Sequence, residues 1–330
     1  MPRSRIVGTG SYVPPRVVTN SEVSPWLRLT SDEVHRRTGI RTRHWVEDGQ
    51  ATSDLAVKAA EKALEASGVS PSSVDTIVLS TTSPDMAFPS TACHVQRSLR
   101  ATQAAAFDVA ASCSGFLYGL SMADCLIRSG QSRRCLVVAA EVKSRFLDLK
   151  DETTAVLFGD GAGAALVVGE TAVGSQPPGI MGIRLYADGT RHKLIGMPAG
   201  GSRRPASRET VRDGLHTIRM QGGPLFRVAV KRLAAAIGDI LKEFGVGLDE
   251  LDRVLFHQAN GRLLRALAKR LQTSEEKWYS VLEQLGNTSS ASLPIALDHA
   301  VREGKVRSGD LVLLGTFGGG ITWATGLLRW

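Results

Sequence analysis

Short apolar runs alternate with longer amphipathic segments along most of the chain. Five of the runs are continuous in their apolar character: 76–79, 135–140, 164–168, 254–256 and 311–314. Strands of this kind are typical of sheets that are covered on both faces. Two longer segments, Asp54–Ser67 and Leu225–Phe244, have helical periodicity, and Gly68 and Gly245 follow them as C-terminal caps. The pattern predicts a layered α/β fold.

The second half of the pattern faintly repeats the first. Val74–Leu79 parallels Leu251–Phe256, and Gly159–Gly163 parallels Gly318–Gly320, each glycine group leading into a strand. Two halves of about 150 residues or slightly more fit the chain length. We expect an N-terminal half over residues 1–173 and a C-terminal half over residues 174–330. The segment Gly196–Arg212, rich in Pro, Gly, Ser and Arg, is expected to lie on the surface.

The composition excludes several classes of protein. Hydrophobic residues make up 43% of the chain and charged residues 22%, which is ordinary for a folded protein and excludes disorder. No apolar run approaches the roughly 18 residues of a membrane-spanning helix. The first residues, Met1–Gly8, lack the apolar stretch of a secretory signal. We therefore expect a cytoplasmic protein that does not enter a membrane.

The chain carries 40 Lys and Arg against 32 Asp and Glu, a net charge of +8. This excess has two interpretations, a general bias toward arginine or a function in attracting acidic partners. Nucleic acid is the weakest of those partners, because the basic residues are scattered and only 5% of residues are aromatic. Phosphorylated cofactors or acidic carrier proteins fit the charge better.

Four cysteines stand at positions 93, 113, 125 and 135. Their spacing matches no zinc motif, so no metal site is expected. Structural disulfides are also not expected in a cytoplasmic chain. The cysteines are then expected to pack in the core, unless one of them is a nucleophile.

Cys113 has the local context of a nucleophile. A strand-like run enters from Phe107, small residues make a turn, and an apolar helix follows over about 114–128. At a helix N-terminus the free N–H groups and the helix dipole would stabilise a thiolate and lower its pKa. A buried cysteine beside a tight turn explains the same residues equally well, so both interpretations stay open.

Three further features are individually weak. His257 follows a predicted strand, at the strand end where α/β proteins place their sites, although most lone histidines are structural. Asn287 lies in a polar loop before a helix, where capping is the usual role. Gly318–Gly320 lets the backbone approach a ligand closely, or simply makes a tight strand entry.

Taken together and in this order, these residues resemble the thiolase superfamily, and more narrowly β-ketoacyl-[acyl carrier protein] synthase III, the initiating condensing enzyme of bacterial fatty acid synthesis. The resemblance covers nearly the whole chain. It rests on eight segments: Ile6–Pro14, Arg37–Arg41, Phe88–Ala92, Phe107–Gly115, Phe158–Ala164, His257–Asn260, Gly286–Ser289 and Phe317–Gly320. Elongating synthases use a second His, and thiolases use a second Cys near the C-terminal glycines, where this chain has Phe317–Gly320. Asn287 with Cys113 and His257 therefore favours decarboxylative condensation over thiolysis.

The resemblance implies a duplicated five-layer α-β-α-β-α fold and a homodimer in which Phe88 reaches into the partner's acyl pocket. Cys113 would carry the acyl group as a thioester. The backbone N–H groups of Cys113 and Gly319 would form the oxyanion hole. His257 and Asn287 would bind the thioester carbonyl of malonyl-acyl carrier protein and stabilise the enolate left by decarboxylation.

The resemblance also implies the substrate contacts. Acyl-CoA and malonyl-acyl carrier protein are substrates, and no cofactor is expected. The residues expected to contact acyl-CoA, besides Phe88, are Arg37, Arg262, Phe317 and Gly222. Arg262 and Arg265, on the helix after His257, are expected to dock the acidic carrier protein.

The sequence departs from the family where the CoA adenine would bind. Val34-His35 stands where a stacking Trp is usual, Glu152 replaces an Arg, and Gly223 replaces an Asn near the pantetheine. Three interpretations stay open: an initiating enzyme with a weaker CoA site, a specialised synthase with another primer or a carrier-bound donor, or an acyltransferase that does not condense.

Overall fold

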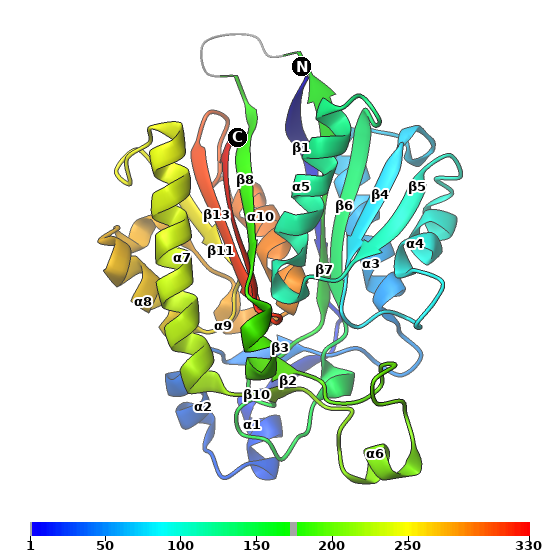
Figure 1. Cartoon of the computed structure of the whole chain (residues 1–330), viewed down its shortest axis with the longest axis vertical. Coiled ribbons are helices and arrows are strands. Elements are labelled where there is room, and N and C mark those ends of the chain that lie inside the picture. Colours follow the sequence, from blue (N-terminus) through cyan, green and yellow to red (C-terminus); the bar gives the residue numbers. More distant parts are fainter. Residues whose placement is uncertain (1, 172–176) are drawn as a thin grey trace.

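Two five-stranded sheets of the same topology form the framework of the computed structural model, which describes residues 2–171 and 177–330 (Figure 1). The first sheet has the order β1 (Arg3–Tyr12), β7 (Gly161–Glu170), β6 (Arg134–Glu141), β4 (Thr76–Ser80), β5 (Ala105–Val109). The second has the order β8 (Gly179–Ala187), β14 (Thr322–Arg329), β13 (Leu311–Gly318), β11 (Arg253–Phe256), β12 (Trp278–Tyr279).

The pairing directions of the two sheets are identical. In each sheet the first three strands in these orders pair antiparallel, and the last three pair parallel. Strand β4 therefore corresponds to β11, and β7 to β14, as the two sequence repeats predicted. The boundary predicted between residues 173 and 174 lies outside the described residues.

Helices lie between the sheets and on both outer faces, which gives the five expected layers (Figure 1). Helices α5 (Gly115–Arg128) and α10 (Ser292–Arg302) contact strands of both sheets and form the central layer. Helices α3 (Thr52–Ser67) and α4 (Thr91–Leu99) cover the first sheet. Helix α7 (Gly222–Phe244) covers the second sheet, and α8 (Gly261–Leu271) packs beside it.

Shorter elements close one end of the layers. They are α1 (Asn20–Val23), α2 (Ser31–Thr38), α6 (Arg208–Arg212), α9 (Leu282–Leu285), and the strand pairs β2 (Val17–Thr19) with β3 (Thr42–His44) and β9 (Ile195–Gly196) with β10 (Arg219–Met220). The segment 196–212 is mostly exposed, as expected, although its end forms α6. No helix in residues 2–171 or 177–330 has both the length and the apolar character needed to span a membrane.

The local predictions agree with the structure. All five continuous apolar runs lie within strands β4, β6, β7, β11 and β13, and both predicted helices lie within α3 and α7. Gly68 and Gly245 end those helices in the left-handed conformation, with φ of +66° and +64°. The central strands are buried along almost their whole length because helices cover both faces.

Several polar side chains lie at or just after the carboxyl ends of the parallel strands, at one edge of each sheet. The segments that follow β4 and β5 carry Thr82 and Cys113, β6 ends at Glu141, and His257 follows β11 directly. Carboxyl ends of neighbouring parallel strands meet at the same edge. These residues of both halves are therefore brought to one region.

We expect Gly10→Ala to lower the free energy of unfolding by about 1–3 kcal/mol. A Cβ at Gly10 would lie 2.3 Å from the Ala59 carbonyl oxygen and 2.5 Å from the Ala63 nitrogen, so β1 and α3 would have to separate. Urea denaturation measures the change. Gly238→Ala on the exposed face of α7 is the control, since no atom lies within 4 Å of its added Cβ. That variant should be unchanged or up to about 1 kcal/mol more stable. Equal effects of the two changes would contradict this account.

Candidate active site

Cys113 lies in a strained turn between β5 and α5. The turn is a short 3-10 segment, Ser112–Ser114, and Ser112 has a φ of +49°, which is unusual for a residue with a side chain. Cys113 itself is only 7% exposed. The predicted strand–turn–helix context is confirmed.

The glycine-rich end of β13 packs directly against this turn. A Cβ on Gly318 would lie 2.6 Å from the backbone nitrogen of Cys113, and a Cβ on Gly319 would lie 3.0 Å from Ser112 Oγ. Only glycine at position 318 leaves the amide of Cys113 uncrowded. The structure thus brings together the two residues, Cys113 and Gly319, whose amides were expected to form an oxyanion hole.

His257 is buried, and its Nδ1 has a polar neighbour. Its Nδ1 lies 2.6 Å from Ser292 Oγ, and the same hydroxyl accepts a bond from the Gln258 amide at 3.1 Å. The Ser292 hydroxyl can donate its own proton to Nδ1, and in that arrangement the imidazole proton is on Nε2. Burial lowers the pKa of His257 to about 3, so the ring is neutral near pH 7.

Among the residues that the structure describes, the Asn287 side chain has partners for its oxygen and for one of its two N–H donors. Its Oδ1 accepts a bond from the Ser289 amide at 2.9 Å, and its Nδ2 donates to the Ala259 carbonyl at 3.3 Å. A side-chain amide has two N–H donors. The second is therefore available to a ligand in the cavity that Asn287 lines.

One cavity of about 450 Å³ collects most of the predicted site. Cys113, His257 and Asn287 line it, and a second cavity of about 150 Å³ meets it at Cys113 and Gly319. The substrate residues predicted from the family that also line the larger cavity are Arg37, Gly222, Arg262 and Phe317. Arg227, which the sequence reasoning missed, lines it too.

Two predicted residues lie outside both cavities. Arg265 is exposed on α8, one turn from Arg262, so the two guanidinium groups share a face of that helix. Phe88 is 85% exposed on the loop before α4, near the partly exposed Met86. Within a single chain, Phe88 does not contribute to the acyl pocket.

The expected lowering of the Cys113 pKa is wrong for this structure. Burial raises the pKa of Cys113 to about 11, and the hydrogen bond with Ser289 offsets only part of that effect. The Glu141 carboxylate raises the pKa further, against the opposing charge of Lys143. The start of helix α5 lowers the pKa of Cys113 less than the loss of water raises it. The resting site therefore holds a thiol beside a neutral imidazole.

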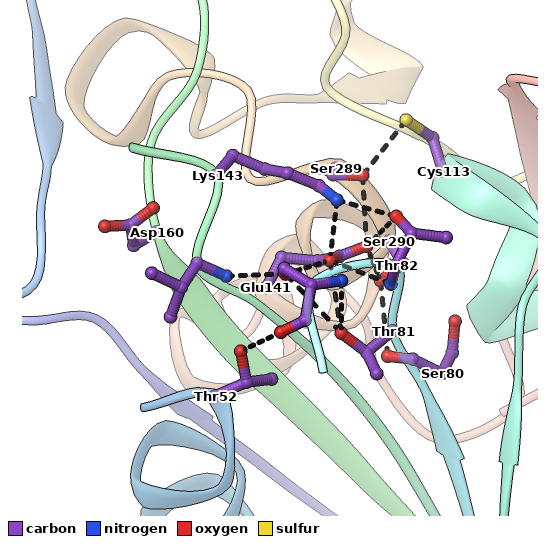
Figure 2. Close-up of polar contacts among 12 residues, drawn as sticks. Thr52, Ser80, Thr81, Thr82, Cys113, Glu141, Lys143, Asp160, Ser289 and Ser290 are labelled. Atoms are coloured by element: carbon purple, nitrogen blue, oxygen red, sulfur yellow. Dashed lines mark hydrogen bonds and ion pairs between the residues drawn. The ribbon is translucent and has the colours of Figure 1, made fainter. Parts of the chain in front are cut away.

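A chain of buried polar groups lies beneath the thiol (Figure 2). Cys113 Sγ is 3.2 Å from Ser289 Oγ, which in turn is 3.2 Å from Glu141 Oε1. Because a carboxylate only accepts hydrogen bonds, Ser289 donates to Glu141 and accepts from the neutral thiol. Ser289 has a φ of +54°, so the residue that orients the sulfur is itself held in a strained conformation.

Glu141 is the centre of this chain of groups. It is fully buried and accepts bonds from Ser83 Oγ at 2.6 Å and Ser290 Oγ at 2.9 Å, while Lys143 Nζ pairs with it at 2.9 Å. Burial alone would raise the pKa of Glu141, but the ion pair and the hydrogen bonds bring it below the usual value. The carboxylate and the ammonium are therefore both charged in the protein interior.

The sequence reasoning missed Ser289, Glu141 and Lys143. A usable signal existed for Glu141, because a carboxylate directly after the buried run Cys135–Ala140 occupies the carboxyl end of a central strand. Ser289 stands two residues after Asn287, within a loop that the sequence explains as capping. Their roles depend on contacts between distant segments.

The structure shows the surroundings of the residues at which the sequence departs from the family. Val34 is completely buried and cannot stack on a ligand, and Trp45 is buried with its Nε1 bonded to the Phe158 carbonyl. Glu152 pairs with Arg37 at 3.6 Å and accepts a bond from the Arg28 amide at 3.2 Å. Trp26, two residues before Arg28 in the sequence, is 44% exposed.

All four cysteines are free. Cys93 and Cys125 are exposed, whereas Cys113 and Cys135 are buried. Within the described ranges, no group of three or more His, Cys, Asp and Glu side chains is arranged to hold a metal ion.

Comparison with known proteins gives a consistent result. Residues 107–189 match the family model of 3-oxoacyl-[acyl-carrier-protein (ACP)] synthase III, and residues 241–330 match the model of its C-terminal part. The chain is 46% identical to the β-ketoacyl-[acyl-carrier-protein] synthase III of Caldanaerobacter subterraneus, over 98% of this chain and 97% of that protein. The protein of the same name from Xanthomonas campestris is 45% identical over 99% and 98%. The crystal structure of the Aquifex aeolicus 3-oxoacyl-[acyl-carrier-protein] synthase III superposes with a TM-score of 0.91, at 39% identity, covering 99% of this chain and 100% of that one.

The lowered pKa of His257 predicts a pH-dependent stability. The unfolded chain takes up a proton at this residue near pH 6.5, whereas the folded chain takes it up only near pH 3. Stability is therefore lost as the pH falls below 6.5. Between pH 7 and pH 5 the free energy of unfolding should fall by about 1–2 kcal/mol more than in a His257→Asn variant. Urea denaturation at several pH values measures this difference, and parallel curves for the two proteins would contradict it.

Proposed function

The chain belongs to the β-ketoacyl-[acyl-carrier-protein] synthase III family, and from that membership we propose that it condenses an acyl primer with malonyl-acyl carrier protein by decarboxylation, the step that initiates fatty acid synthesis. The observation that carries the proposal is the common cavity of Cys113, His257 and Asn287. The two cavities that meet at Cys113 provide one space for the acyl group and another for the incoming thioester.

The first half-reaction loads the primer. Cys113 Sγ attacks the thioester carbonyl, the new C–S bond forms, and CoA leaves as a thiol that takes up the cysteine proton. The carbonyl oxygen gains negative charge during the attack. The amides of Cys113 and Gly319 are proposed to stabilise that oxygen, which the close approach of Gly318 to the turn supports.

The second half-reaction extends the primer by two carbons. The bond between the malonyl α-carbon and its carboxylate breaks, carbon dioxide leaves, and the electron pair becomes an enolate on the carrier-bound thioester. The enolate carbon then attacks the acyl carbonyl, and Cys113 leaves as a thiolate that takes up a proton from solvent. His257 Nε2–H and the spare Asn287 Nδ2–H are proposed to donate to the enolate oxygen.

The neutral state of His257 suits this role. A neutral imidazole with its proton on Nε2 donates a hydrogen bond without bringing a charge into the buried site. The two donors also distinguish the candidate functions. Simple acyl transfer without condensation develops no enolate, so it gives His257 and Asn287 no charge to stabilise.

The rim of the larger cavity suits the phosphates of CoA. Arg37, Arg227 and Arg262 line it, and guanidinium groups bind phosphate well. Glu152 already pairs with Arg37, however, which reduces the positive charge available to the nucleotide. We propose a CoA site that holds the pantetheine arm firmly and the adenine loosely, with Trp26 as the nearest exposed aromatic side chain.

We propose that the enzyme acts as a homodimer in the cytoplasm, with the acyl carrier protein as its protein partner and without a cofactor. Phe88 is 85% exposed and Met86 45% exposed on one loop, which favours burial of this loop by a second copy of the chain. Contact of Phe88 with the partner's acyl pocket stays a prediction.

Two substitutions should separate the half-reactions. Asn287→Ala should leave acylation of Cys113 within a few-fold of normal and reduce malonyl decarboxylation about 100-fold, because only the second step develops enolate charge. Ser289→Ala should act mainly on acylation, by about tenfold, because it removes the hydroxyl that can turn from Glu141 to donate to the sulfur as the thiolate forms. Intact-mass spectrometry measures acylation, and released carbon dioxide measures decarboxylation. If both variants lost both steps equally, the two residues would have only a structural role.

Carrier-protein docking should depend on salt through Arg262 and Arg265. We expect kcat/KM for malonyl-acyl carrier protein to fall about fivefold between 0.05 and 0.5 M NaCl, mainly through KM, because exposed charges are screened. The double variant Arg262→Ala/Arg265→Ala should show a weaker salt dependence. Arg133→Ala is the matched control, since Arg133 is exposed at the other end of β6, roughly 25 Å from Glu141. If kcat/KM of the unmodified protein did not depend on salt, the net charge of +8 would reflect a general bias toward arginine and would not attract the carrier protein.

A further inference from the structure

The wall of the smaller cavity is largely apolar, and Lys143 is its one basic side chain, beside the hydroxyl residues Thr82, Ser112 and Ser289. Its volume is about 150 Å³, and a cavity of that size admits a molecule of about six non-hydrogen atoms, such as benzene. It opens at Cys113, so it is the space next to an acyl group on the sulfur. The apolar residues of its wall are Phe146, Phe158, Ile195, Met197 and Ile218, and Lys143 lies among them.

The ammonium of Lys143 has one N–H donor without a partner among the described residues. The Lys143 side chain is 8% exposed, and its Nζ donates to Glu141 Oε2 at 2.9 Å and to Thr82 Oγ1 at 2.6 Å (Figure 2). An ammonium has three N–H donors, and residues 2–171 and 177–330 supply partners for two of them. The third is available to whatever occupies the cavity that Lys143 lines.

An unsubstituted acyl chain would leave this donor without a partner. Such a chain displaces water from the cavity and offers no acceptor atom in return, which is costly for a charged group. An oxygen on the acyl chain would replace the water. The cavity wall therefore distinguishes acyl chains by whether they carry an acceptor oxygen as well as by their size.

The charges of Glu141 and Lys143 determine whether a charged or a neutral oxygen is favoured. Glu141 already neutralises Lys143, and both are buried. A second carboxylate would leave an uncompensated negative charge in the interior, whereas a hydroxyl or carbonyl oxygen accepts the hydrogen bond without one.

We propose that Lys143 is a specificity-determining residue, and that the small cavity accepts a short primer carrying a neutral oxygen, a hydroxyl or a ketone, in preference to the plain alkyl chain of the same length. This inference rests on the proposed function, because it assumes that Cys113 carries the acyl group. It adds the chemical class of the primer, which the family membership does not determine.

The test compares matched primers as CoA thioesters. The oxygen-bearing probes are 3-hydroxybutanoyl-CoA and 4-oxopentanoyl-CoA, their alkyl counterparts are butanoyl-CoA and pentanoyl-CoA, and succinyl-CoA is the anionic probe. Single-turnover acylation of Cys113 is followed by intact-mass spectrometry. We expect at least one oxygen-bearing probe to react tenfold or more faster than its alkyl counterpart, and succinyl-CoA to react more slowly than both oxygen-bearing probes.

Two variants assign the preference to Lys143. Lys143→Met removes the donor but leaves Glu141 unpaired, so Glu141→Gln/Lys143→Met is made as well to keep the interior neutral. Circular dichroism and thermal melting identify which variant is folded. In the folded variant the alkyl probes should react at least as fast as the oxygen-bearing ones.

The outcomes separate this inference from the proposed function. If no acyl-CoA, acetyl-CoA included, labels Cys113 of the unmodified protein, both fail together. If acetyl-CoA labels Cys113 and condensation follows, but both alkyl probes react as fast as their oxygen-bearing counterparts, the inference alone is overturned. A preference that survives unchanged in the folded variant also overturns it.

Discussion

The contact between the end of β13 and the turn of Cys113 is the constraint on which the site depends. The backbone of the second half meets that of the first so closely that a Cβ on Gly318 would lie 2.6 Å from the Cys113 nitrogen. Glycine at that position therefore allows the duplicated sheets to share one site. Cys113 and Gly319 line the same cavity as His257 and Asn287, at the place where this contact joins the two halves.

A second constraint is the charge buried beneath the nucleophile. Glu141 ends β6 and is bonded by side chains from the segment after β4 and from the loop that follows Asn287. It thus ties together three parts of the chain at the level of the thiol. The ion pair with Lys143 compensates the charge of this buried carboxylate, and the same lysine lines the small cavity. The proposed primer selection would therefore depend on the same ion pair that the interior needs for its charge balance.

The layered α/β fold could be predicted from local patterns, whereas the five layers and the site residues followed from the resemblance of whole segments to a known family. Continuous apolar runs mark the buried strands, and Cys113, His257 and Asn287 stand at the ends of elements within recognisable segments. The pKa of Cys113 could not be predicted, since it depends on how completely the second half covers the turn. The donor count of Lys143 depends on Thr82, 61 residues away, and the pairing of Arg37 with Glu152 joins segments that lie even further apart in the sequence. Those contacts exist only in the folded chain.

The central claim is that Cys113 carries the primer that malonyl-acyl carrier protein then extends. The most direct measurement loads the enzyme with isotopically labelled acetyl-CoA, maps the labelled peptide by mass spectrometry, and then adds malonyl-acyl carrier protein. The account predicts a label on the peptide that contains Cys113. On addition of the second substrate, the label should move to 3-oxobutanoyl-acyl carrier protein as an equal amount of carbon dioxide is released. A label on Cys93, Cys125 or Cys135, or transfer of the acetyl group without carbon dioxide release, would contradict it.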